Sequence, residues 1–180
     1  PTYKNGKVKF EHIVVDSSVD FDPTKGTVSR GSSECPHCGV GKQTKEIREE
    51  IKSGDFEYRI YAVNYSDRRG NAKFRAGSEV DAQGLNKAAE RVESDFDILD
   101  FLTEPITEGH NTSQIKRYGM DEWRDIFTPR QLITHYEYLQ AFKKYEPEIR
   151  ERYSKDKSEA ILTLLGLFSS RVTEFNSRLA

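Results

Sequence analysis

The chain has 180 residues, of which 35% are hydrophobic, 11% aromatic and 32% charged, and its formal net charge is −2. This length allows a core of useful size, and twenty aromatic side chains can supply buried area. The near-neutral balance excludes a strong overall attraction to nucleic acid, so any such binding has to come from a local patch. The sequence has no apolar run of membrane-spanning length and no signal peptide, so we expect a cytoplasmic protein with no membrane partner.

The charge is unevenly distributed along the chain. Residues 1–75 carry 14 basic and 11 acidic side chains, residues 76–127 carry 5 and 12, and residues 128–180 carry 9 and 7. Together with the hydrophobic patterns, this predicts three segments with different surroundings. They are a β-rich module over 1–76, an acidic helix and linker over 77–117, and a helical pair over 118–180.

The N-terminal segment shows strand and turn patterns. Alternating and then apolar residues predict a strand over 7–15, and a second, short strand is expected within 26–30. Residues 43–53 predict a short polar helix that Gly54 ends. A strand over 56–65, the turn "SDRRGN" and a returning strand from residue 72 predict a β-hairpin.

The rest of the chain is predicted to be mainly helical. Residues 78–102 predict a helical stretch, with Gly84 as a candidate break, and residues 105–117 predict a loop. Thr128 as N-cap, Pro129 at the first position and Gln131 in a capping box predict a helix start. Pro147 is expected to end or bend that helix.

A last helix is expected over 156–179, because its apolar residues recur at helical spacing. The stripe consists of Ile161, Leu164, Leu165, Phe168, Val172, Phe175 and Leu179. This helix and the one before it are expected to pack as an antiparallel pair, which completes an α+β fold. Part of the stripe would remain unpaired, which favours a dimer of the chain in a crystal.

The chain contains two cysteines, Cys35 and Cys38, in the stretch "ECPHCG". The two-residue spacing lets both sulfurs face one point, and Gly39 permits a tight turn, so the pair predicts half of a zinc knuckle. A redox pair is the alternative, but the glycines that follow disfavour the helix such a site needs. Zinc requires four ligands, and the other two are missing from the sequence pattern.

The predicted hairpin carries basic side chains among aromatic ones, a combination that suits nucleic-acid phosphates and bases. Its candidate contacts are Arg68, Arg69, Lys73 and Arg75, with Tyr65 and Phe74 beside them. The alternative is a solvated hairpin tip. No catalytic triad, carboxylate pair or glycine-rich nucleotide loop is arranged for chemistry, so we assign no catalytic residue.

Three stretches resemble the middle region of large adenine-specific DNA methyltransferases that contain a zinc ribbon. They are "GTVSRGSSECPHCG" (26–39), "YGMDEWRDIFTPRQLITHYEYLQAF" (118–142) and "LTLLGLFSSRVTEFNSRLA" (162–180). Their order and spacing also match, whereas residues 77–117 show no such likeness.

The resemblance implies that a first Cys-x-x-C precedes the segment "KVKFEHIVV", so that the partners of Cys35 and Cys38 lie upstream of Pro1. It also implies an S-adenosylmethionine loop further upstream and an Asp-Pro-Pro-Tyr motif downstream; the chain itself contains no Pro-Pro. The chain would then be an internal fragment, inserted where some amino-methyltransferases carry DNA target recognition.

We therefore expect a DNA-facing or cleft-shaping segment of an adenine-specific DNA methyltransferase that transfers no methyl group by itself. Its partners would be DNA and the rest of the methyltransferase chain. S-adenosylmethionine would belong to the parent only, and zinc would bind the fragment weakly or not at all. The alternatives are a non-enzymatic zinc-ribbon adaptor that binds nucleic acid or protein, and a structural spacer.

Overall fold

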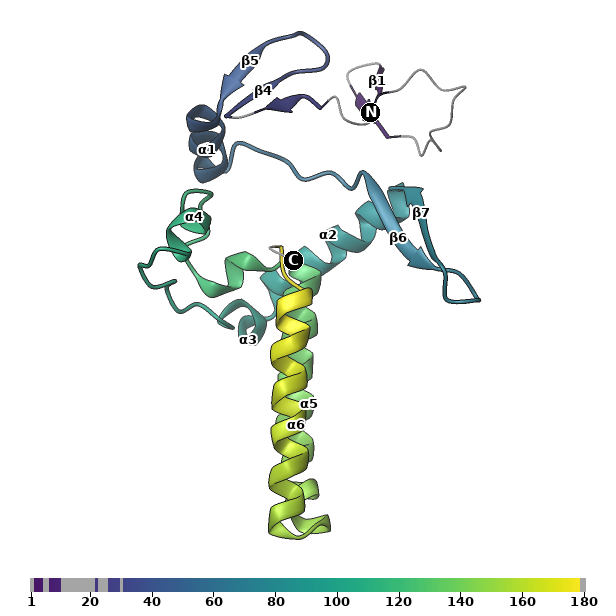
Figure 1. Ribbon diagram of the computed structural model, residues 1–180, viewed down its shortest axis with the longest axis vertical. Helices are drawn as coiled ribbons and strands as arrows, with labels where there is room; N and C mark the ends of the chain where they lie inside the picture. Colours follow the sequence, from purple (N-terminus) through teal and green to yellow (C-terminus); the bar gives the residue numbers. More distant parts are fainter. Residues whose placement is uncertain (1, 5–6, 11–21, 23–25, 30, 179–180) are drawn as a thin grey trace. The chain divides into compact units, whose positions relative to one another are not determined.

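The computed structural model describes residues 2–4, 7–10, 22, 26–29 and 31–178 (Figure 1). The fold is mixed α+β, with small antiparallel sheets and with helices following in the C-terminal part. The predicted α+β class is confirmed. The chain divides into two compact units, Pro1–Gln83 with Arg117–Gly119, and Gly84–Lys116 with Met120–Ala180. The division after Gln83 falls inside a helix, and the three predicted segments stay a prediction.

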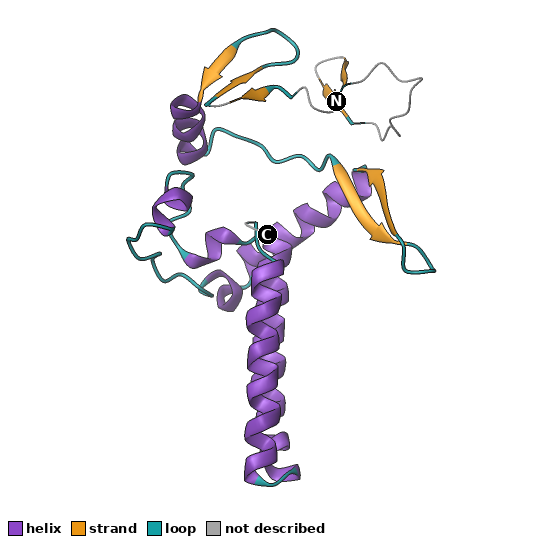
Figure 2. Ribbon diagram, in the orientation of Figure 1, coloured by secondary structure: helices purple, strands orange, loops and turns teal. Residues whose placement is uncertain are grey.

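Two of the sheets lie at the start of the first unit (Figure 2). Strand β1 (Thr2–Lys4) pairs with β2 (Lys7–Lys9), and β3 (Val28–Ser29), β4 (Ser32–Glu34) and β5 (Gly41–Gln43) form an antiparallel sheet in that order. Strand β2 begins the strand predicted over 7–15, whose residues 11–15 lie outside the described residues. Strand β3 is the short strand expected within 26–30.

Helix α1 (Thr44–Ser53) follows directly from β5 and matches the predicted polar helix. The carboxylate of Glu46 accepts a hydrogen bond from the Gln43 backbone N–H at 2.7 Å, which satisfies a donor that the first turn leaves unpaired. Gly54 ends the helix in the left-handed conformation.

Strands β6 (Ala62–Ser66) and β7 (Ala72–Ala76) form the predicted hairpin. The predicted start of its first strand at residue 56 is wrong, because residues 55–61 belong to no strand. The ladder ends at the pair Ala62–Ala76, beyond which the Gly77 N–H donates to the Tyr61 carbonyl at 3.4 Å before α2 begins at Glu79. Tyr58 and Tyr61 consequently remain 63% and 69% exposed.

Helix α2 (Glu79–Ser94) passes through Gly84, so the candidate break there is wrong. The helical stretch divides instead at Asp95, which begins α3 (Phe96–Leu99) by accepting a hydrogen bond from the Ile98 N–H at 3.4 Å. The predicted loop over 105–117 contains a short helix, α4 (Thr112–Lys116). A 3-10 turn, η1 (Trp123–Ile126), leads to the long helices.

Helix α5 (Pro129–Arg152) starts with the predicted cap. The Thr128 hydroxyl accepts from the Gln131 N–H at 3.4 Å, and the Gln131 side chain accepts from the Thr128 N–H at 2.8 Å. Pro147 does not end the helix. Pro147 and Lys143 are both exposed, so water can satisfy the Lys143 carbonyl that has no N–H partner in the helix.

The core of the second unit lies where α3 meets the start of α5. Ile98, Phe127 and Leu132 are at most 5% exposed and pack together. Phe127 directly precedes the N-cap and Leu132 is four residues beyond it, which makes the pair a hydrophobic staple. Trp123, four residues earlier, is 37% exposed and lies outside this buried cluster.

Helices α5 and α6 (Lys155–Phe175) form the expected antiparallel pair (Figure 1). The Tyr138 hydroxyl donates to the Leu165 carbonyl at 2.8 Å, and the buried Ser158 hydroxyl donates to the Ile149 carbonyl at 3.0 Å. Near the other end, the His135 Nε2 lies 3.1 Å from the Asn176 carbonyl oxygen.

The apolar residues of α6 form two neighbouring faces and not the single predicted stripe. Ile161, Leu165 and Val172 are half-buried on one face, whereas Leu164, Phe168 and Phe175 are 67%, 57% and 63% exposed. The prediction grouped both sets together because it treated a wide stripe as one contact surface. Across the described residues, no helix is long and apolar enough to cross a membrane.

Truncation of Leu132 tests the core of the second unit. We expect Leu132→Ala to lower the free energy of unfolding by about 2–5 kcal/mol, because it leaves a cavity beside Ile98 and Phe127. The matched variant Leu164→Ala, at a side chain 67% exposed on α6, should change the free energy of unfolding by no more than about 0.5 kcal/mol. Urea denaturation measures both, and equal decreases in stability would contradict the burial described for this core.

Candidate functional site

The two cysteines lie on the tight connection between β4 and β5. The Cys35 N–H donates to the Val40 carbonyl at 2.9 Å, and the Gly39 N–H donates to the Cys35 carbonyl at 2.9 Å. Gly39 has a φ of 71°, which a residue with a side chain rarely adopts, so glycine is what lets the chain return after Cys38. Cys35 and Cys38 are thereby held on one short loop.

The two cysteines lie close together without a covalent bond between them. Cys35 and Cys38 come within 3.6 Å of each other, and neither forms a disulfide. A disulfide would need its sulfurs at about 2.05 Å. Two thiolates that bind one tetrahedral zinc, each at about 2.3 Å, stand about 3.8 Å apart. The observed separation is therefore close to one edge of a zinc tetrahedron.

Backbone N–H groups stabilise a thiolate at Cys35. Hydrogen bonds from the backbone of Cys38 and of His37, together with one from the Cys38 side chain, lower the pKa of the Cys35 thiol. The thiolate is the form that binds a metal ion. The loop thus holds the two cysteines close together and favours the thiolate form of Cys35.

The donor set is incomplete within the described part of the chain. There, no group of three or more histidine, cysteine, aspartate or glutamate side chains could hold a metal ion. Two thiolates satisfy half of a tetrahedron, so Cys35 and Cys38 fit zinc only with two further ligands from elsewhere. That the 180-residue chain holds zinc weakly or not at all stays a prediction.

The second predicted site is the hairpin between β6 and β7, whose loop is fixed by Asp67. Its carboxylate accepts from the backbone N–H groups of Arg69 at 2.8 Å and Asn71 at 2.9 Å, and its carbonyl accepts from the Gly70 N–H at 2.9 Å. The bonds from Asn71 lower the pKa of Asp67. Arg68 and Arg69 are exposed at the apex of this ordered loop.

The structure separates the four predicted basic residues. Lys73 pairs with Tyr65 across the hairpin, and Arg75 lies two residues further along the same face. The Arg75 guanidinium binds both carboxylate oxygens of Asp81, at 2.6 and 2.7 Å, which raises the pKa of Arg75 and lowers that of Asp81. Arg75 therefore has an internal partner, whereas Arg68 and Arg69 lie beyond that ion pair at the tip. Phe74 is on the opposite face.

Two carboxylates that organise these residues were missed by the sequence analysis. Asp67 had a readable signal, because Asp three residues before Gly is typical of a type I turn. No sequence signal identified Asp81, because its contact with Arg75 depends on how α2 starts after the hairpin. Comparison of the chain with known protein families, curated proteins and solved structures finds no match.

Alkylation tests the thiolate at Cys35. The test measures how the rate of reaction of Cys35 with iodoacetamide depends on pH in a Cys38→Ser variant. The pH at which this rate reaches half its maximum should be lower in the folded chain than in the unfolded chain. In the unfolded chain an ordinary thiol titrates near pH ~8.5. The reason is that the backbone N–H groups of residues 37 and 38 remain in place to stabilise the anion. Equal midpoints in the folded and unfolded chains would show that the loop does not act in this way.

Proposed function

We propose that the chain is a segment of an S-adenosylmethionine-dependent, adenine-specific DNA methyltransferase, and that it engages the DNA target or shapes the cleft that receives it. The observation that carries the DNA-facing part is the hairpin apex, where Asp67 orders a loop that exposes Arg68 and Arg69. Two guanidinium groups on an ordered loop can bind backbone phosphates at a low cost in conformational entropy.

The motif "YGMDEWRDIFTPRQL" supports a scaffolding role for the second unit. The Asp125 carboxylate accepts from the backbone N–H groups of Asp121 and Glu122, each at 2.9 Å, and Arg124 donates to the Leu99 carbonyl. Phe127 and the Thr128 cap then seat the start of α5. These residues position the long helix pair, as expected of a segment that shapes a cleft and does not perform the chemistry.

The proposal leaves the reaction to other parts of the parent protein. S-adenosylmethionine supplies the methyl group, and the residues that hold it and the target adenine would lie outside this chain. Cys35 and Cys38 would supply two of the four zinc ligands, with DNA and the remaining methyltransferase chain as partners. We place the protein in the reducing cytoplasm because a Cys-x-x-Cys pair there is typical of a metal site.

The knuckle also fits a second candidate, a non-enzymatic zinc-ribbon adaptor that binds nucleic acid or protein. The coding sequence on either side distinguishes the two. A methyltransferase has an S-adenosylmethionine loop upstream and an Asp-Pro-Pro-Tyr motif downstream, and the absence of both from the gene product would overturn the methyltransferase proposal.

DNA binding by the 180-residue chain tests the role of the hairpin apex. We expect Arg68→Gln/Arg69→Gln to lower the affinity for a labelled 20-base-pair duplex, as measured by fluorescence anisotropy. The slope of log K against log salt should fall by about 1 for each phosphate that the variant no longer neutralises. The control Lys42→Gln/Arg59→Gln removes the same charge from residues paired with Glu50 and Glu57. Equal effects of the two double variants would show that only net charge matters.

A further inference from the structure

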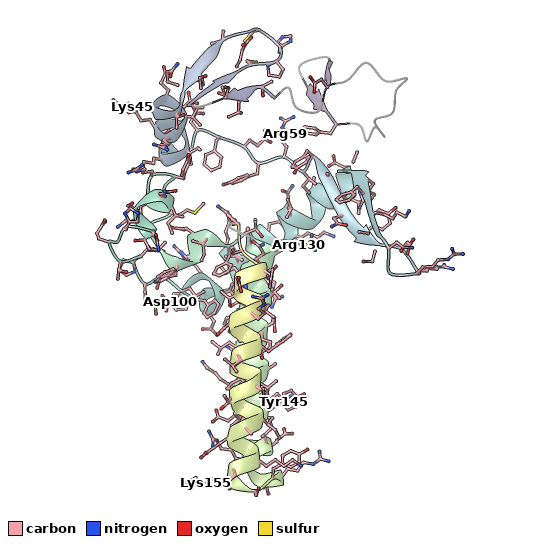
Figure 3. All side chains as sticks on the ribbon, in the orientation of Figure 1. Lys45, Arg59, Asp100, Arg130, Tyr145 and Lys155 are labelled. Carbon is pink, nitrogen blue, oxygen red and sulfur yellow. The ribbon has the colours of Figure 1, made fainter. Side chains whose placement is uncertain are left out.

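Helix α1 gathers basic side chains on one face. Lys45, Arg48 and Lys52 are spaced three and four residues apart, so they lie above one another along the helix. Two acidic residues of α1 are engaged elsewhere, since Glu46 accepts from the Gln43 N–H and Glu50 pairs with Lys42. Lys45, labelled in Figure 3, is 86% exposed.

A segment distant in sequence adds a fourth cation to this face. The Arg48 guanidinium carbon lies 5.0 Å from the centre of the Tyr118 ring, and its Nη2 donates to the Tyr118 hydroxyl at 3.4 Å. Gly119 has a φ of 73°, and a Cβ there would lie 3.5 Å from the Lys52 Cα. The backbone at Gly119 therefore approaches α1 closely, and this approach brings Arg117 beside the helix.

These residues line a hollow of about 210 Å³, formed by Lys45, Arg48, Glu49, Lys52 and Arg117. Four cations face one carboxylate, which leaves an excess of three positive charges. Glu49 is 3.8 Å from Lys45 and largely exposed, so it neutralises little of the charge. Among the described residues, no carboxylate lies within ion-pair distance of Arg48, Lys52 or Arg117.

One donor in the hollow lacks a protein partner. The Nε of Arg48 is shielded from solvent and makes no hydrogen bond with any described residue. A buried N–H without a partner costs free energy, so such a group points to a ligand that accepts from it. Contact with the Tyr118 ring holds the guanidinium plane in place.

We propose that this hollow binds a backbone phosphate of duplex DNA, as a second binding point besides the hairpin apex. A phosphodiester offers two anionic oxygens to the planar fork of Arg48, and the surrounding lysines and Arg117 complement its charge. The inference rests on the proposed function, because it assigns a further DNA-binding point to the same segment. It also gives the Tyr-Gly pair at 118–119 a role, namely to hold Arg48 and Arg117 at this face.

The salt dependence of DNA binding by the 180-residue chain tests the hollow. The variant Lys45→Gln/Lys52→Gln changes two exposed side chains, so it should fold normally, which circular dichroism checks. For each phosphate charge that the variant no longer neutralises, we expect the affinity for the 20-base-pair duplex at 0.1 M salt to fall roughly eightfold and the salt slope to fall by about 0.9. The control Lys42→Gln/Arg59→Gln should retain the wild-type slope.

Arg48→Lys separates charge from hydrogen-bond geometry. Lysine keeps the positive charge but lacks Nε and the planar fork, so we expect weaker binding with a nearly unchanged salt slope. Wild-type affinity in this variant would contradict donation by Arg48. If the wild-type chain binds DNA and Lys45→Gln/Lys52→Gln keeps the full slope, the hollow is overturned and the hairpin proposal stands. If the wild-type chain does not bind the duplex, both are overturned.

Discussion

A tetrahedral zinc ion needs four ligands, and we propose that the loop between β4 and β5 supplies two of them, at nearly the separation of one tetrahedral edge. That separation is maintained by the hydrogen bonds that close the loop and by the left-handed conformation of Gly39. The N–H groups directed at Cys35 favour the thiolate that a metal requires. Our functional interpretation depends on this geometry, since it accounts for a cysteine pair that neither a disulfide nor a core position explains.

A second constraint acts on the basic side chains of the first unit. Some carboxylates there neutralise a cation, whereas others order a loop and leave its cations without an ion pair among the described residues. Asp81 binds Arg75, and Glu50 binds Lys42, so neither cation needs an external partner. Asp67 instead uses its oxygens on backbone N–H groups, which orders the loop without neutralising Arg68 and Arg69. The distribution of carboxylates therefore distinguishes structural cations from candidate DNA-binding ones more sharply than local charge density does.

The sequence predicts those parts of the fold that local chemistry determines. The cap at Thr128, the end of α1 at Gly54, the α+β class and the hairpin all follow from residues within a few positions of each other. Where the outcome depends on a distant partner, the pattern misleads: residues 56–61 have strand composition but form no strand, and Leu164 belongs to the apolar stripe of α6 yet is 67% exposed. Arg48 illustrates the same limit for sites, because Tyr118 is 70 residues away along the chain.

Zinc analysis of the full-length gene product tests most directly the central claim that Cys35 and Cys38 form half of a zinc site. The account predicts that the purified parent protein contains a tightly bound zinc ion and that Cys35→Ser/Cys38→Ser removes one equivalent, because these thiolates form half of its coordination shell. An unchanged zinc content in the double variant, or a parent without zinc, would contradict the assignment of this loop as a zinc knuckle.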